Sequence, residues 1–133
     1  MKSRIPRNLK VAYFVLVGAQ VLHAVEEYFA GFAEAFSFTN AWSKSTGIPA
    51  RVICNWIDVV YVLVWLSLGF LVLKNRVRAA ILVFAIIQLY QAMAAHVGWS
   101  VQAIGYSPGV ITSVFLLIPT SCYMIVEYIK LSG

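Results

Sequence analysis

Two histidines and two adjacent glutamates carry the strongest chemical signal in this sequence. His23, Glu26 and Glu27 have the spacing i, i+3 and i+4, so both carboxylates lie near the imidazole on one face of a helix. They stand near the end of an apolar run, where ionisable side chains are costly to insert and usually bind, conduct or catalyse. His96 stands near the end of another apolar run. These residues predict a buried polar site.

Adjacent carboxylates inside a membrane favour general acid/base catalysis. Two such groups in a low dielectric cannot both ionise cheaply, so one is expected to hold a proton beside an acceptor. Glu26 and Glu27 are the predicted catalytic acid/base pair, and His23 and His96 are their predicted catalytic partners. Because the site would lie within the bilayer, the expected partner is a membrane lipid or another lipophilic small molecule.

The same side chains also suit a metal ion. Two imidazoles and two carboxylates are ligands for zinc, or for iron in a non-haem site, and here they come from His23, Glu26, Glu27 and His96. The H-x-x-E spacing lets both side chains reach one ion from successive turns. Signatures such as H-E-x-x-H have a second histidine on the same helix, which this sequence lacks. Metal binding and metal-free acid/base catalysis therefore remain two alternatives.

Four apolar segments must position these residues. Of the 133 residues, 62% are hydrophobic and 11% are charged, whereas a soluble domain carries about 25% charged residues. An α-helix needs about 20 apolar residues to cross a bilayer. Charges, Pro and Gly bound the four segments at about 11–29, 53–73, 79–99 and 107–128. The sequence predicts an all-α fold, a single integral membrane domain over residues 1–133 that forms a four-transmembrane-helix bundle. Pro119 predicts a kink in the last helix.

The basic residues predict the orientation of this bundle. The side with both termini holds eight of them, namely Lys2, Arg4, Arg7, Lys10, Lys74, Arg76, Arg78 and Lys130, whereas the other holds Lys44 and Arg51. The positive-inside rule then puts both termini in the cytoplasm, and we expect a multi-pass protein of a bacterial plasma membrane. The net charge of +5 does not indicate nucleic acid, because these residues flank apolar runs instead of sharing a solvated face.

The polar residues of the four spans are expected at a similar depth in the membrane. The first and third spans run outward and carry their His and Glu near the far end, whereas the second and fourth run inward and carry their polar residues near the beginning. All of them fall in the outer half of the bilayer, which predicts one site assembled from four helices. The residues expected to support and orient the catalytic groups are Gln20, Asn55, Asp58 and Thr112.

Two hypotheses without catalysis remain open. In the first, the cluster conducts protons or binds a cation; one short chain has little room for an alternating-access repeat, so a transporter would need a homo-oligomer. In the second, the polar groups only hydrogen-bond the helices to one another, at about 0.6 kcal/mol per contact. The free-energy cost of inserting two carboxylates into the membrane exceeds the energy of such hydrogen bonds, which favours a binding or catalytic role for them.

The sequence also resembles a known family. His23-Ala24-Val25-Glu26-Glu27 matches the signature of the HXXEE family of small integral membrane proteins. Asn55, His96, the segment Tyr106-Ser-Pro-Gly-Val-Ile-Thr112 and Pro119 look like the later motifs of that family. The resemblance covers most of the chain. It implies a membrane architecture and the location of a site, and it implies no particular reaction.

Overall fold

The computed structural model describes residues 4–131, and this part of the chain is entirely helical outside its turns. Four helical segments are long and apolar enough to cross a membrane: Arg7–Ala30, Ala50–Leu73, Ala79–Gln102 and Val110–Lys130. The predicted all-α fold with four candidate spans is therefore confirmed. The first three helices extend beyond the apolar runs, because polar residues at the membrane surface continue a helix. The fourth begins later than predicted, because residues 107–109 form a turn.

The first two spans are continuous α-helices, and the last two are interrupted. The continuous spans are α1 (Arg7–Ala30) and α4 (Ala50–Leu73). Two shorter helices connect them, α2 (Phe32–Ala35) and α3 (Ser37–Thr46). The third span consists of α5 (Ala79–Tyr90), the π-helix η1 (Gln91–Val97) and α6 (Gly98–Ala103). The fourth consists of α7 (Val110–Thr112), the π-helix η2 (Ser113–Leu117) and α8 (Ile118–Lys130).

The interruption of the fourth span has a local cause in the sequence. Pro119 has no backbone N–H to donate to the carbonyl of Phe115 four residues earlier, so the regular α-helical pattern fails at this point. The irregularity predicted at Pro119 takes the form of the π-helix η2, which ends directly before α8. Single π-turns of this kind are rare and occur mostly at functional sites.

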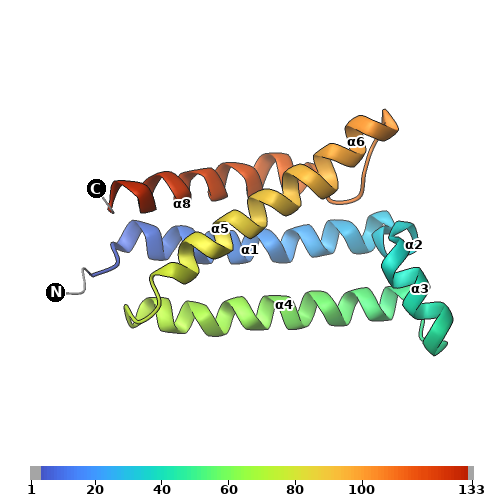
Figure 1. Cartoon of the computed structure of the whole chain (residues 1–133), viewed down its shortest axis with the longest axis horizontal. Helices are drawn as coiled ribbons and strands as arrows, with labels where there is room; N and C mark the ends of the chain where they lie inside the picture. The colour runs from blue at the N-terminus through green and yellow to red at the C-terminus, as the bar shows by residue number, and fades with distance from the viewer. Residues whose placement is uncertain (1–3, 132–133) are drawn as a thin grey trace.

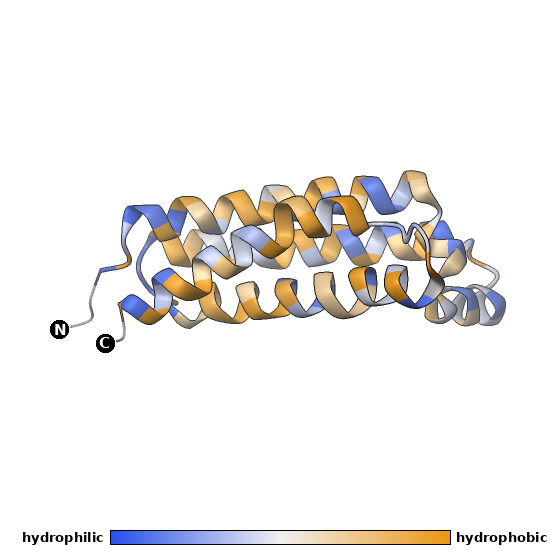
Figure 2. Ribbon diagram, turned by 90° about the horizontal axis from the view of Figure 1, so that it is seen from above, coloured by the Kyte–Doolittle hydropathy of each residue, from blue (hydrophilic) through white to orange (hydrophobic). Residues whose placement is uncertain are grey.

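The helices form one bundle with both termini at the same end (Figure 1). The turn between α4 and α5 lies at this end too, and α2 and α3 lie at the opposite end. α1 occupies the middle and contacts α4, α8 and η2. Hydrophobic residues cover most of the bundle length, and hydrophilic residues gather towards its ends (Figure 2). This distribution fits a bundle with the bilayer around its middle.

An aromatic core fills the half of the bundle nearer the termini. The ring of Phe84 stacks on Trp65 with a centroid separation of 4.2 Å, and Tyr13 lies 5.2 Å from Phe84. The Tyr13 hydroxyl donates a hydrogen bond of 2.7 Å to the carbonyl of Trp65, so its polar end is satisfied inside the apolar core. This packing fixes α1, α4 and α5 against one another, and the predicted catalytic residues lie nearer the opposite end of the bundle.

Candidate metal centre

The site is built on one face of α1. His23 and Glu27 lie one turn apart, and both are buried, with relative exposures of 0% and 4%. α1 ends at Ala30, and Gly31 caps it in a left-handed conformation with φ of 76°. The N–H of Gly31 donates to the carbonyl of Glu27. Only glycine adopts this φ readily, so Gly31 fixes the end of the helix directly after the site.

His96 completes the site from the third span. It lies on the π-helix η1, whose wider turn interrupts the side-chain register of the span next to the site. Its ring is fully buried and meets the ring of His23 edge to face, with the centroids 4.5 Å apart. The sequence predicted that His23 and His96 share a membrane depth, and the structure brings them into direct contact.

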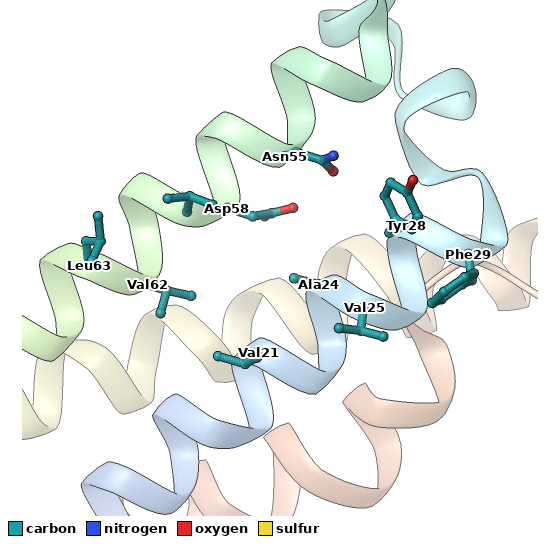
Figure 3. Close-up of a pocket in the computed structure, with 10 residues that line it drawn as sticks. Val21, Ala24, Val25, Tyr28, Phe29, Asn55, Asp58, Val62 and Leu63 are labelled. Atoms are coloured by element: carbon teal, nitrogen blue, oxygen red, sulfur yellow. The ribbon is translucent and has the colours of Figure 1, made fainter.

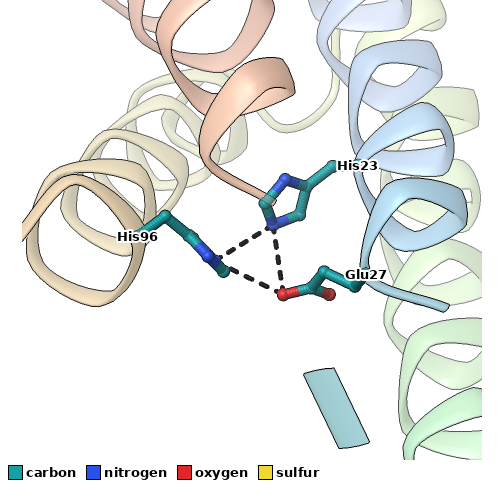
Figure 4. A group of neighbouring side chains, drawn as sticks. All are labelled: His23, Glu27 and His96. Atoms are coloured by element: carbon teal, nitrogen blue, oxygen red, sulfur yellow. Dashed lines mark hydrogen bonds and ion pairs between the residues drawn. The ribbon is translucent and has the colours of Figure 1, made fainter. Parts of the chain in front are cut away.

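The three side chains point one donor atom each at a common centre (Figure 4). The Nε2 atoms of His23 and His96 are 3.1 Å apart. Oε1 of Glu27 lies 3.5 Å from the first of these nitrogens and 3.4 Å from the second. This oxygen is buried and accepts no hydrogen bond in the structure. We call this group of His23, Glu27 and His96 the triad.

The hydrogen bonds of the two Nδ1 atoms show which ring nitrogen carries a proton in each imidazole. Nδ1 of His96 lies 2.7 Å from the carbonyl oxygen of Pro108, which only accepts, so Nδ1 carries the proton. Nδ1 of His23 lies 2.8 Å from Oγ1 of Thr112. The Thr112 hydroxyl donates its own proton to Oε2 of Glu26 at 2.6 Å, so Nδ1 of His23 must donate as well. Because Nδ1 carries a proton in each ring, Nε2 is the nitrogen that can present a lone pair to the centre of the triad.

Glu26 has a different role from its neighbour Glu27. Its carboxylate faces the beginning of the fourth span, where it accepts hydrogen bonds from the backbone N–H groups of Ile111 at 3.2 Å and Thr112 at 2.8 Å. It also accepts from the hydroxyl of Tyr106 at 2.7 Å. Partial burial of that phenol, its hydrogen bond to Glu26 and the nearby negative charge raise the pKa of Tyr106 to about 12. Glu26 thus holds Thr112 against His23 and does not join the triad.

Gly109 allows the fourth span to approach both imidazoles. Its φ of 85° is left-handed, and a Cβ atom there would lie 2.6 Å from Cε1 of His23 and 2.9 Å from Nδ1 of His96. On another side the ring of Phe32 in α2 lies 5.7 Å from the ring of His96. Phe36 and Trp99 pack around Phe32 and extend this aromatic cover. The triad is therefore enclosed by backbone and aromatic rings.

The remaining predicted residues occupy three different places. Thr112 touches the triad, as described above. Gln20 is buried one turn before His23, with a side-chain oxygen that has no hydrogen-bond partner in the described structure. Asn55 and Asp58 lie on α4 and line a groove between α1 and α4 (Figure 3). The structure therefore unites four predicted residues, His23, Glu27, His96 and Thr112, and puts Glu26 behind Thr112.

Sequence reasoning missed four contributors to the site. The carbonyl of Pro108 and the backbone of Gly109 are invisible to an argument from side-chain chemistry. Tyr106 belongs to the segment 106–112 that carried part of the family resemblance, which was the one available signal for it. Phe32 gave no signal, because its role depends on how α2 folds back over His96.

Comparison with known proteins identifies a family. A family model described as "Protein of unknown function with HXXEE motif" matches residues 14–124. That range includes the triad and every residue that contacts it in the description above. The comparisons with curated proteins and with solved structures gave no match.

Proposed function

This chain belongs to the HXXEE family, and we propose that it is an intramembrane metalloenzyme in which His23, Glu27 and His96 bind one divalent metal ion. The observation that carries the proposal is the convergence of three electron-pair donors on one buried point. Two imidazole nitrogens and a carboxylate oxygen that all present lone pairs to one point repel one another at such separations unless a cation lies between them. A metal ion satisfies all three donors at once.

The separations of the three donor atoms support zinc. In a tetrahedral zinc site with bonds of about 2.0–2.1 Å, neighbouring ligand atoms are about 3.3–3.4 Å apart. In an octahedral site with similar bonds they are about 3.0 Å apart. The triad has separations of 3.1, 3.4 and 3.5 Å, which resemble the tetrahedral value more closely. Iron, which two histidines and one carboxylate also bind, is the second expected metal.

The arrangement around the triad resembles that of a catalytic centre. Two histidines and one carboxylate leave a coordination position open in catalytic zinc sites, whereas structural sites are closed by four protein ligands. A divalent ion in such a site supplies a Lewis acid and an activated water molecule. Thr112 and Pro108 fix the two rings, and Glu26 fixes Thr112, which is the usual outer support of metal-binding histidines.

The substrate that we propose is lipophilic. The triad lies within candidate membrane spans, where lipid and not water surrounds the bundle. We also propose that the bundle lies in a bacterial plasma membrane with both termini in the cytoplasm. The excess of basic residues at the end of the bundle that holds the termini supports this orientation.

A metal-free acid/base enzyme is the second candidate. The separation of 3.1 Å between the Nε2 atoms of His23 and His96 equals a hydrogen-bond length, so one added proton also relieves the repulsion. That proton would be shared with Glu27, and these three residues would perform the acid/base chemistry. Glu26 would not take part directly, because its oxygens already accept from Tyr106, Ile111 and Thr112.

Elemental analysis of the purified protein separates these candidates. We expect about one equivalent of zinc or iron per chain, measured by plasma mass spectrometry after purification without chelators. His23→Ala and Glu27→Gln should each lose it. Glu34→Gln is the matched control, because this glutamate is exposed, lies on α2 outside the spans and pairs with Arg51.

Reconstitution with added metal tests whether an empty site results from loss of metal during purification. Wild-type protein stripped with a chelator and incubated with zinc, or with ferrous iron under anaerobic conditions, should regain one equivalent. Wild-type protein that takes up neither metal excludes the metalloenzyme and leaves the acid/base candidate.

A further inference from the structure

A groove between α1 and α4 forms a second site, separate from the triad (Figure 3). Its volume is about 460 Å³, within the range of about 300–1,000 Å³ that is typical of small-molecule sites. Most of its wall is aliphatic or aromatic, contributed by Val21, Val25 and Phe29 from α1 and by Val59, Val62 and Leu63 from α4. The groove is therefore built for an apolar chain or ring.

The groove opens towards the surface that faces the bilayer. Val25 and Val59, on opposite walls, have relative exposures of 47% and 48%. Both residues belong to candidate membrane spans, and α4 is the least buried of the four spans. An occupant would therefore enter sideways from the lipid and not from water.

One wall carries a carboxylate without a counter-ion. Asp58 is half-buried, and its Oδ2 accepts a long hydrogen bond of 3.9 Å from the thiol of Cys54. Among residues 4–131, no lysine or arginine forms an ion pair with Asp58. Arg51, two turns earlier on the same face of α4, is engaged by Glu34 at 2.9 Å.

We infer that this groove binds a lipophilic amine, with its protonated head group beside Asp58 and Asn55 and its apolar chain between α1 and α4. A carboxylate in an apolar groove is strongly stabilised by a cation that reaches it directly. The side-chain oxygen of Asn55, one turn from Asp58, accepts a further N–H from the same head group. A neutral chain would leave the charge of Asp58 unpaired, and an anionic chain would be repelled by Asp58.

Native mass spectrometry in a neutral detergent tests this inference with three probes of equal chain length: dodecylamine, dodecanol and dodecanoate. We expect the amine to bind wild-type protein with one equivalent and at least about tenfold more tightly than the other two. Asp58→Asn keeps the size of the side chain and should remove this preference. Glu127→Gln removes an acid that pairs with Lys130 at the other end of the bundle, and this variant should retain the preference.

A second pair of variants tests the location. Val25→Trp fills the groove from an exposed position and should reduce amine binding, whereas Val83→Trp adds the same bulk at an exposed position on α5 and should not. Circular dichroism verifies that each variant remains helical. Because the groove does not include the triad, His96→Ala should bind the amine as wild type does even if it has lost metal.

Three results would overturn the inference. The first is equal binding of all three probes, which would indicate a general lipid groove. The second is unchanged amine preference in Asp58→Asn. The third is a wild-type dimer that Val25→Trp dissociates and that binds no amine, which would make the groove an interface between two copies of this chain. Failure of amine binding with metal still present would leave the proposed metal centre intact.

Discussion

Nδ1 of His23 and Oγ1 of Thr112 lie 2.8 Å apart, and this hydrogen bond joins the first membrane span to the last. The Thr112 hydroxyl donates in turn to Glu26, which lies three residues after His23 on α1. Glu26 therefore orients the imidazole of its own helix through a residue from another helix. The two adjacent glutamates of the H-x-x-E-E motif therefore have different roles. Glu27 is a member of the triad, and Glu26 orients the ring of His23 through Thr112.

Thr112→Val should weaken metal binding without removing a ligand. The substitution keeps the shape of the side chain but leaves Nδ1–H of His23 without a partner and removes one of the two hydrogen bonds that Oε2 of Glu26 accepts. Loss of such outer contacts typically lowers metal affinity about 10–100-fold. Competition against a chelator of known affinity measures the change. Thr112→Ser retains the hydroxyl and should stay near wild type, and an unchanged affinity in Thr112→Val would show that this contact does not orient His23.

The location of the site could be predicted from the sequence because the bilayer makes each ionisable residue informative. A buried His or Glu in an apolar run needs a partner at its own depth, so alternation of the spans was enough to group His23, Glu27 and His96. The roles within the group could not be predicted. On a helix, i+3 and i+4 are both neighbours of i, and the choice between Glu26 and Glu27 depends on where the fourth span begins.

The backbone of the last two spans could not be predicted in the same way. Hydropathy reports the length of an apolar run and is insensitive to the one extra residue per turn that defines a π-helix. His96 lies on such a turn, and Thr112 lies directly before another. The left-handed conformation of Gly109 could not be predicted either, because a glycine in a turn does not indicate which side chains pack against it.

Tyr106 should make stability depend on pH in the alkaline range. The pKa of this phenol rises from its ordinary value of 10.0 to about 12 in the folded protein, because of partial burial and the hydrogen bond to Glu26. A raised pKa means that the contribution to stability is complete below pH 10 and is lost as the pH rises towards 12. Thermal unfolding of wild type and Tyr106→Phe should therefore differ at neutral pH and converge towards pH 12.

The matched control for this experiment is Tyr90→Phe, which removes the hydroxyl of a tyrosine that is 74% exposed. Its melting curve should follow the wild-type pH dependence throughout. A constant difference between wild type and Tyr106→Phe across the alkaline range would mean that the hydrogen bond to Glu26 does not stabilise the fold.

Both termini should be in the cytoplasm. Eight basic residues flank the spans at the end that holds the termini, and only Lys44 and Arg51 lie at the other end, so the positive-inside rule favours this orientation. In a bacterial host, green fluorescent protein fused after Gly133 should fluoresce and alkaline phosphatase fused there should be inactive. The converse pattern would contradict this orientation and would place the triad in the inner half of the bilayer.

Gly109→Ala should disrupt the triad without altering any of its side chains. The new Cβ would lie 2.6 Å from Cε1 of His23 and 2.9 Å from Nδ1 of His96, so at least one ring must move. The left-handed φ of 85° adds strain for any residue other than glycine, and together we expect a destabilisation of about 1–3 kcal/mol. Metal content measured under the conditions used for wild type should fall sharply.

Gly18→Ala is the matched control for this substitution. Gly18 is exposed in the middle of α1, and a Cβ atom there would have no neighbour within 4 Å. Alanine should stabilise the helix by about 0.5–1 kcal/mol and leave metal binding unchanged. If Gly109→Ala kept a full equivalent of metal at wild-type affinity, the two imidazoles would not both be ligands, because at least one ring must leave its present position beside the new methyl group.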